Sequence, residues 1–176
     1  MTTTINDFPD VATRAKELGC VVPEKFAVLP RNFLGADSID DLVHESNTAT
    51  VRTLLRNERL TETPIEPEGK KFPYAQENDF TWVGPIIFFT AAQLTENSNL
   101  VSVSLSVLAN YLTDFFRGMT GQRKIKVDIV VEQTKTKKHV HVQFEGDMDG
   151  FKELPNTILE LVHNERVSST VSKETE

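Results

Sequence analysis

Alternation of hydrophobic and polar residues is clearest between residues 124 and 144. Ile125, Val127, Ile129 and Val131 recur at every second position, and so do Val140, Val142 and Phe144. Side chains two residues apart point to the same face of a strand, so each run predicts a strand with one buried face. The connecting residues, 133–138, are polar, and we therefore expect a β-hairpin.

Residues 99–116 carry two patterns at once. Val101, Val103 and Leu105 alternate with serines, as in a strand, but hydrophobic residues also recur at steps of four and three through Leu112 and Phe115. The run is too long for a typical strand, and Gly118 is a good residue to follow a helix end. We interpret residues 99–116 as a helix.

Two further elements complete the second half of the chain. Residues 80–89 are rich in aromatic residues and isoleucine, which predicts a central strand, with a bulge at Gly84-Pro85 because proline cannot donate to a ladder. Residues 146–150 predict a turn whose aspartates cap a final helix starting near Phe151, with Pro155 in its first turn. The order strand, helix, strand, strand, helix predicts an α+β fold of two layers, a small mixed or antiparallel sheet with helices on one face.

The first half is less regular. The first ten residues are polar, and we expect them to be loose. A helix is expected from Val11 to Leu18 with Gly19 as its stop, followed by a short strand or buried loop at 26–29 and a helix at 39–46 capped by Ser38. Residues 50–56 suit a helix or a strand, and we favour the helix.

The chain predicts one globular domain over residues 1–163. Within it, residues 61–79 contain three prolines and a glycine and predict a long loop, which is often functional or mobile in a compact domain. Residues 164–176 are polar, and we expect a disordered tail.

Composition narrows the classes of function. The chain has 176 residues, a net charge of −7 and one cysteine, Cys20. The acidic balance excludes a polycation that binds nucleic acid by bulk charge, and a lone cysteine excludes a disulfide framework and a cysteine-rich zinc module. The N-terminus lacks the features of a secretory signal, and no apolar run is long enough for a membrane span, so we expect a cytoplasmic protein without a membrane partner.

One stretch departs from the acidic average. Residues 117–138 have a local net charge of +5, which suggests a surface for nucleic acid or an acidic partner. The competing interpretation is an edge hairpin protected by lysines. The basic residues are Arg117, Arg123, Lys124, Lys126, Lys135, Lys137 and Lys138.

The segment His139-Val140-His141 suggests a metal site. Two histidines at positions i and i+2 of a strand share a face, and Glu145 continues that face, so the three side chains form a candidate metal-binding set, with Asp128 as an alternative to Glu145. The His-x-His spacing followed by Glu145 resembles the start of a cupin metal motif, but the glycine spacing and the second cupin motif are missing. The alternative is a polar, solvent-facing side of the hairpin.

The sequence contains no phosphate-binding glycine loop, dinucleotide fingerprint or nucleophile elbow. We therefore expect a non-enzymatic interaction or regulatory subunit of a cytosolic complex, with no cofactor, whose partner is another protein or a second copy. A nucleic-acid-binding module and a metal-dependent enzyme are the alternatives. The residues expected at a partner interface are Val103, Val107, Tyr111, Phe116, Phe72 and Tyr74.

Overall fold

A computed structural model describes residues 2–76, 80–121, 123–133 and 138–171, with side chains described through residue 160. Its strands form a five-stranded mixed sheet in the order β1-β5-β4-β3-β2, in which only β3 and β4 pair in parallel. The strands are β1 (Thr2–Phe8), β2 (Ala27–Leu29), β3 (Thr81–Phe89), β4 (Lys124–Glu132) and β5 (His139–Gly146).

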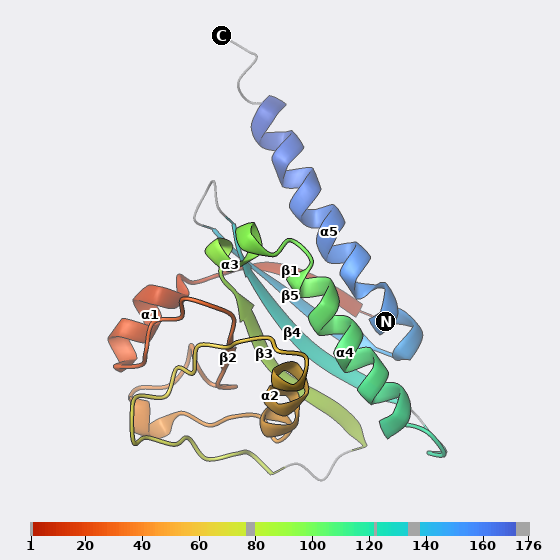
Figure 1. Ribbon diagram of the computed structural model, residues 1–176, viewed down its shortest axis with the longest axis horizontal. Coiled ribbons are helices and arrows are strands. Elements are labelled where there is room, and N and C mark those ends of the chain that lie inside the picture. Colours follow the sequence, from red (N-terminus) through yellow and green to blue (C-terminus); the bar gives the residue numbers. More distant parts are fainter. Residues whose placement is uncertain (1, 77–79, 122, 134–137, 172–176) are drawn as a thin grey trace.

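Helices flank this sheet unequally. The described helices are α1 (Val11–Leu18), α2 (Thr48–Asn57), α3 (Ala91–Glu96), α4 (Leu100–Phe115) and α5 (Met148–Val171), together with one 3₁₀ turn at Ile39–Asp41. In Figure 1, α4 and α5 lie across one face of the sheet with α2 beside them, and α1 lies at the far end near β2. The predicted α+β fold and the strand-helix-hairpin-helix order of the second half are confirmed.

The larger core lies between the sheet and α2, α4 and α5. Alternate residues of β4 and β5, such as Ile125, Val127 and Val142, face this core, and we call this face the helix side of the sheet. Leu105 and Leu112 of α4 and Ile158 of α5 pack against them. The helix interpretation of residues 99–116 is confirmed, since they form α4. Its buried side chains recur at steps of three and four, as expected for a helix that packs one face against a core.

The opposite face, which we call the open side, is covered at one end only. There α1 packs Val11 and Ala15 with Phe8, Phe88 and Val130 in a second core. The N-terminal end of α1 is capped by Asp10, which accepts a hydrogen bond from the Thr13 N–H at 2.8 Å, and Gly19 ends the helix at φ 77°, as predicted. The rest of the open side is mostly polar, with Thr4, Lys126 and Gln143 exposed and Asp128, His141 and Glu145 half-buried.

The parallel pairing of β3 with β4 is interrupted where the sequence predicted a bulge. The register shifts between Val83 and Ile86, around Gly84-Pro85. A Cβ on Gly84 would lie 2.7 Å from Cζ3 of Trp82 and 2.8 Å from Cγ2 of Val127. Glycine is therefore required here by close packing rather than by a turn.

The structure corrects several expectations. Residues 2–8 are not loose but form β1, because hydrogen bonding to β5 orders a segment with little hydrophobic signal of its own. The helix expected at 39–46 is only the 3₁₀ turn, and α3 was not expected. Residues 50–56 belong to α2, which confirms the helix interpretation.

The last helix also differs from its expected bounds. α5 begins at Met148, where Asp147 accepts a hydrogen bond from the Gly150 N–H at 2.8 Å, so Pro155 lies beyond the first turn. The helix continues past this proline because Phe151, Leu154 and Ile158 all pack into the larger core. It also includes residues 164–171 of the expected tail, whereas 172–176 lie outside the described residues.

Candidate functional site

The two edges of the sheet differ in length and exposure. β1 pairs along its whole length with β5, from Thr2 opposite Glu145 to Phe8 opposite His139, and no strand of the described chain lies on its other side. Residues 4–7 are exposed. β1 therefore presents a row of backbone N–H and C=O groups at the surface.

The other edge, β2, is closed. Ala27, Val28 and Leu29 are fully buried. The backbone next to β2 is occupied by the long loop, since the Thr63 N–H donates to the carbonyl oxygen of Phe26 at 2.9 Å and the Val21 N–H donates to the carbonyl of Ile65 at 2.9 Å. One edge of this sheet is thus short and covered, and the other is long and open.

The composition of β1 lacks the usual protection of an edge. Its sequence, Thr-Thr-Thr-Ile-Asn-Asp-Phe, contains no lysine and no proline, and its one charge is Asp7. Natural edge strands are commonly blunted by charges, prolines or bulges that prevent pairing with another chain. Ile5, at the centre of the strand, is 45% exposed on the helix side.

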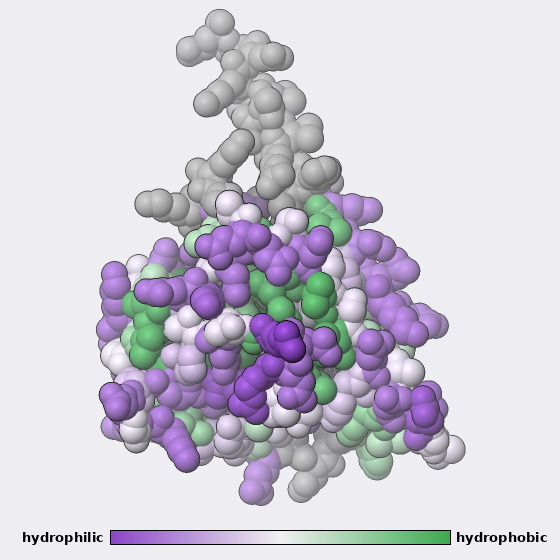
Figure 2. Space-filling view, in the orientation of Figure 1, coloured by the Kyte–Doolittle hydropathy of each residue, from purple (hydrophilic) through white to green (hydrophobic). Residues whose placement is uncertain are grey.

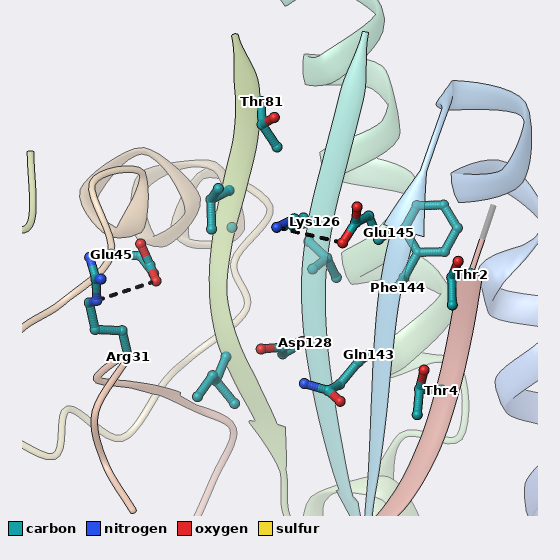
Figure 3. Close-up of a pocket in the computed structure, with 14 residues that line it drawn as sticks. Thr2, Thr4, Arg31, Glu45, Thr81, Lys126, Asp128, Gln143, Phe144 and Glu145 are labelled. Atoms are coloured by element: carbon teal, nitrogen blue, oxygen red, sulfur yellow. Dashed lines mark ion pairs between the residues drawn. The ribbon is translucent and has the colours of Figure 1, made fainter. Parts of the chain in front are cut away.

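A polar hollow lies on the open side next to β1. It has a volume of about 820 Å³ and is lined by Thr2 and Thr4 of β1, Gln143 of β5 and residues of β3, β4 and the 31–45 segment. Figure 3 shows these side chains projecting from the strands, with Arg31 and Glu45 facing them from the neighbouring segment. The hollow is open, and its floor is the sheet itself.

Charges around this hollow are compensated locally. Lys126 Nζ lies 3.5 Å from Oε2 of Glu145, and Arg31 Nε lies 3.9 Å from Oε1 of Glu45 (Figure 3). Glu145 also pairs with Lys124, whose hydrogen bond is the main reason that the pKa of Glu145 is lowered. Because these surface pairs combine positive and negative charges, they do not give the hollow an electrostatic potential of one sign.

The predicted basic surface is divided by the fold. Arg117 pairs with Asp114 at 2.7 Å, and Arg123 donates to the carbonyl of Met119 at 2.7 Å, both beside the start of β4. Lys138 lies at the other end of the hairpin. At about 3.3 Å per residue, the length of β4 places it about 26 Å from Lys124. Lys135 and Lys137 lie outside the described residues. Of the described members, Lys124 and Lys126 lie together at Glu145, whereas Lys138 is separated from them by the length of β4.

The predicted metal set is also separated. His139 and His141 do share the open side, as the spacing required, but each meets its own carboxylate on β4: His139 Nε2 lies 3.3 Å from Oε2 of Glu132, and His141 Nε2 lies 3.7 Å from Oδ1 of Asp128. The ring of His139 also stacks on Phe88. Glu145 is engaged with the lysines instead, and the described residues contain no group of three side chains arranged to hold a metal ion.

The expected partner residues have three different environments. Val103 on α4 is 40% exposed, Val107 and Tyr111 are partly buried, and Tyr74 is exposed. Phe116 and Phe72 are 2% and 4% exposed, so they lie in the cores and are not available to a partner. Figure 2 shows hydrophobic side chains gathered in the middle of the helix side, bordered by hydrophilic ones.

One cluster that the sequence did not reveal joins α2 to the long loop. His44 is buried, and its Nε2 lies 2.6 Å from Oε1 of Glu66. Arg52 donates two hydrogen bonds to Glu66, at 2.8 and 3.1 Å, and pairs with Glu62 at 3.0 Å. This ion-pair cluster of His44, Arg52, Glu62 and Glu66 orders the loop through side chains.

Searches against protein families, curated proteins and solved structures found no match to this chain. Among the described helices, none is both long and apolar enough to cross a membrane. The open β1 edge is the surface whose geometry most directly indicates an interaction.

Proposed function

We propose that this chain is a non-enzymatic protein-interaction module whose β1 edge accepts an extended strand from a partner protein. The observation that carries the proposal is the contrast between the two edges of one sheet. β2 is short, fully buried and covered by the loop, whereas β1 is longer, exposed and without lysine, proline or a bulge. An edge of this kind is a template for strand addition.

In strand addition, affinity and specificity come from different groups of the added strand. Main-chain hydrogen bonds hold any extended segment, and the side chains that alternate along the added strand select it. On β1 the polar Thr2, Thr4 and Asn6 point to the open side, and Ile5 points to the helix side. A partner strand is therefore expected to be polar on one face and to carry a hydrophobic residue opposite Ile5.

The size of the site indicates weak binding. Each backbone hydrogen bond adds roughly 1 kcal/mol net, whereas association costs an estimated 4–15 kcal/mol or so in lost freedom of motion. Seven paired residues therefore support a transient complex unless side chains add further contact. This fits an interaction module better than a permanent subunit joined by strand pairing alone.

The two alternative functions have less support in the geometry. Nucleic-acid binding needs a continuous basic surface, but Lys124 and Lys126 are paired with Glu145, and Arg117 is paired with Asp114. A metal-dependent reaction needs converging ligands, and His139 and His141 meet separate carboxylates.

The proposal is tested by titrating the ¹⁵N-labelled protein with a peptide that has the sequence of β1, Thr2–Phe8. We expect the amide signals of β1 to shift, while those of β2 stay unchanged as an internal control. A peptide carrying Ile5→Pro lacks a central N–H and fixes the wrong backbone angle, so it should bind more weakly. Shifts confined to another surface, or no shift at millimolar peptide, would contradict the proposal.

A further inference from the structure

We propose that the partner strand is β1 of a second copy of this chain, paired antiparallel about a two-fold axis at Ile5. This inference rests on the proposed function and names its partner. It follows from three properties of β1: the equal lengths of strand on either side of Ile5, the position of the one charged residue, Asp7, and the exposure of the Ile5 side chain.

The register follows from the length of the strand. Ile5 is the midpoint of Thr2–Phe8, so an antiparallel pair centred there places every residue of β1 opposite a residue of the other β1. Centring on any other residue leaves part of one strand unpaired. A two-fold interface of this kind is self-complementary and closes after two copies.

The side chains that meet in this register are compatible. Ile5 lies opposite Ile5 of the partner subunit, and Thr4 lies opposite Asn6 of the partner subunit, which pairs two hydrogen-bonding side chains on the open side. Directly opposed residues in antiparallel strands have Cα atoms about 4.5 or 5.5 Å apart, within contact distance of two isoleucines. An exposed isoleucine is thereby buried by its own copy.

The position of Asp7 selects the antiparallel arrangement. In a parallel pair in register, the two Asp7 carboxylates would lie opposite each other. In the antiparallel pair each lies opposite a Thr3, and the two carboxylates are separated by four residues, about 13 Å along the strands. That separation exceeds the Debye length of about 8 Å at physiological ionic strength, so their repulsion is screened.

The pairing joins two sheets into one. The sheet order would run continuously from β2 of one copy, through both β1 strands, to the partner's edge, with α5 on the helix side of each half. The two polar hollows would then lie on the same open side, since Thr2 and Thr4 of each β1 line them. The buried β2 edges remain at the two ends, so the assembly stops at a dimer.

Cysteine cross-linking tests the register directly. The chain has one cysteine, Cys20, which is buried and whose pKa is raised by burial, so an introduced surface cysteine is the reactive thiol. In the Ile5→Cys protein the two thiols face each other across the axis, at a Cα separation that permits a disulfide. We expect mild oxidation to convert this variant to a covalent dimer.

Two matched variants separate this interface from others. Asn6 is also exposed. In Asn6→Cys the two thiols lie one residue either side of the axis, with their Cα atoms about 8 Å apart, too far for a disulfide. We expect it to cross-link at least about tenfold more slowly than Ile5→Cys. Val103→Cys places a thiol on α4, away from β1, and should not cross-link.

The outcomes distinguish the two proposals. Rapid cross-linking of Ile5→Cys alone supports the dimer. Cross-linking of Val103→Cys but not of Ile5→Cys assigns self-association to α4 and overturns it. A third outcome is that Ile5→Cys stays monomeric while the β1 peptide still shifts the β1 amides. In that case the edge accepts a free strand but does not pair with β1 of a second folded copy, and only the dimer is overturned. If neither occurs, both proposals fail.

Discussion

Nε2 of His44 lies 2.6 Å from Oε1 of Glu66, which joins a buried residue ahead of α2 to the long loop that follows it. Arg52 holds the same carboxylate from α2. The loop of residues 61–79 is therefore fixed at Glu62 and Glu66 by charged side chains, and Ile65 between them is buried in the second core. The same loop covers the β2 edge, so the cluster also maintains the contrast between the two edges.

This cluster predicts acid-sensitive stability. Burial raises the pKa of Glu66, but hydrogen bonds from His44 and Arg52 outweigh it and lower the pKa to about 2, from 4.5. A carboxyl whose pKa is lower in the folded protein stabilises the fold above its unfolded pKa and loses that contribution as the pH falls. Glu66 should thus contribute about 3 kcal/mol at pH 7, lost between about pH 4.5 and 2.

Urea unfolding of the wild type and Glu66→Gln across this pH range measures the contribution. The stability difference between the two proteins should be largest near neutral pH and shrink below about pH 4.5. A difference that stays constant down to pH 3 would show that ionisation of Glu66 does not stabilise the fold.

Removal of Arg52 should be more damaging than removal of a neighbouring arginine. Arg52→Ala leaves two mostly buried carboxylates, Glu62 and Glu66, without their cation, and we expect a loss of roughly 3 kcal/mol in unfolding free energy. Arg56→Ala, on the exposed surface of the same helix, should change stability by less than about 0.5 kcal/mol. Equal effects of the two substitutions in urea unfolding would contradict a structural role for the cluster.

The close packing at Gly84 gives a third prediction. A methyl group there would overlap Trp82 and Val127 in the larger core, so Gly84→Ala should destabilise the protein by about 1–3 kcal/mol. Gly35→Ala is the control, because an added Cβ there meets nothing within 4 Å. A shift of the urea midpoint in Gly84→Ala alone is expected, and no shift would show that the bulge can relax.

Added salt affects pairing through β1 and binding through phosphate contacts in opposite ways. The β1 edge carries one charge per copy and the whole chain has a net charge of −7, so added salt should leave the dimer unchanged or tighten it by screening repulsion. Binding through phosphate contacts would instead weaken steeply. Sedimentation equilibrium at about 50 and 500 mM NaCl measures the effect, and a dimer that dissociates at the higher salt would contradict pairing through β1.

The local pattern of hydrophobic and polar residues predicts the helices and strands that bury one of their faces in a core. The hairpin at 124–144, the helix at 99–116 and the glycine stop of α1 all follow from periodicity or capping, and all are present. β1 was missed because an edge strand with exposed residues on both faces has no hydrophobic alternation. The signal available in it was the β-branched content of Thr2, Thr3, Thr4 and Ile5, which favours a strand.

The candidate site was less accessible to sequence reasoning. The spacing of His139 and His141 placed them on one face correctly, but it did not show which β4 carboxylate each would meet. Glu132 lies directly opposite His139, and Asp128 lies diagonally across from His141. The cluster around Glu66 joins residues from a loop, a helix and the segment before that helix. Such contacts depend on the tertiary fold, and no local pattern encodes them.

The central claim is that β1 is an open edge that pairs with a second β1. Hydrogen exchange of the β1 amides, measured residue by residue at low and high protein concentration, tests it most directly. We predict that amides at alternate positions of Thr2–Phe8, those pointing away from β5, gain protection as concentration rises, while the amides of β2 do not change. Exchange at every β1 position that is independent of concentration up to the millimolar range would contradict the claim.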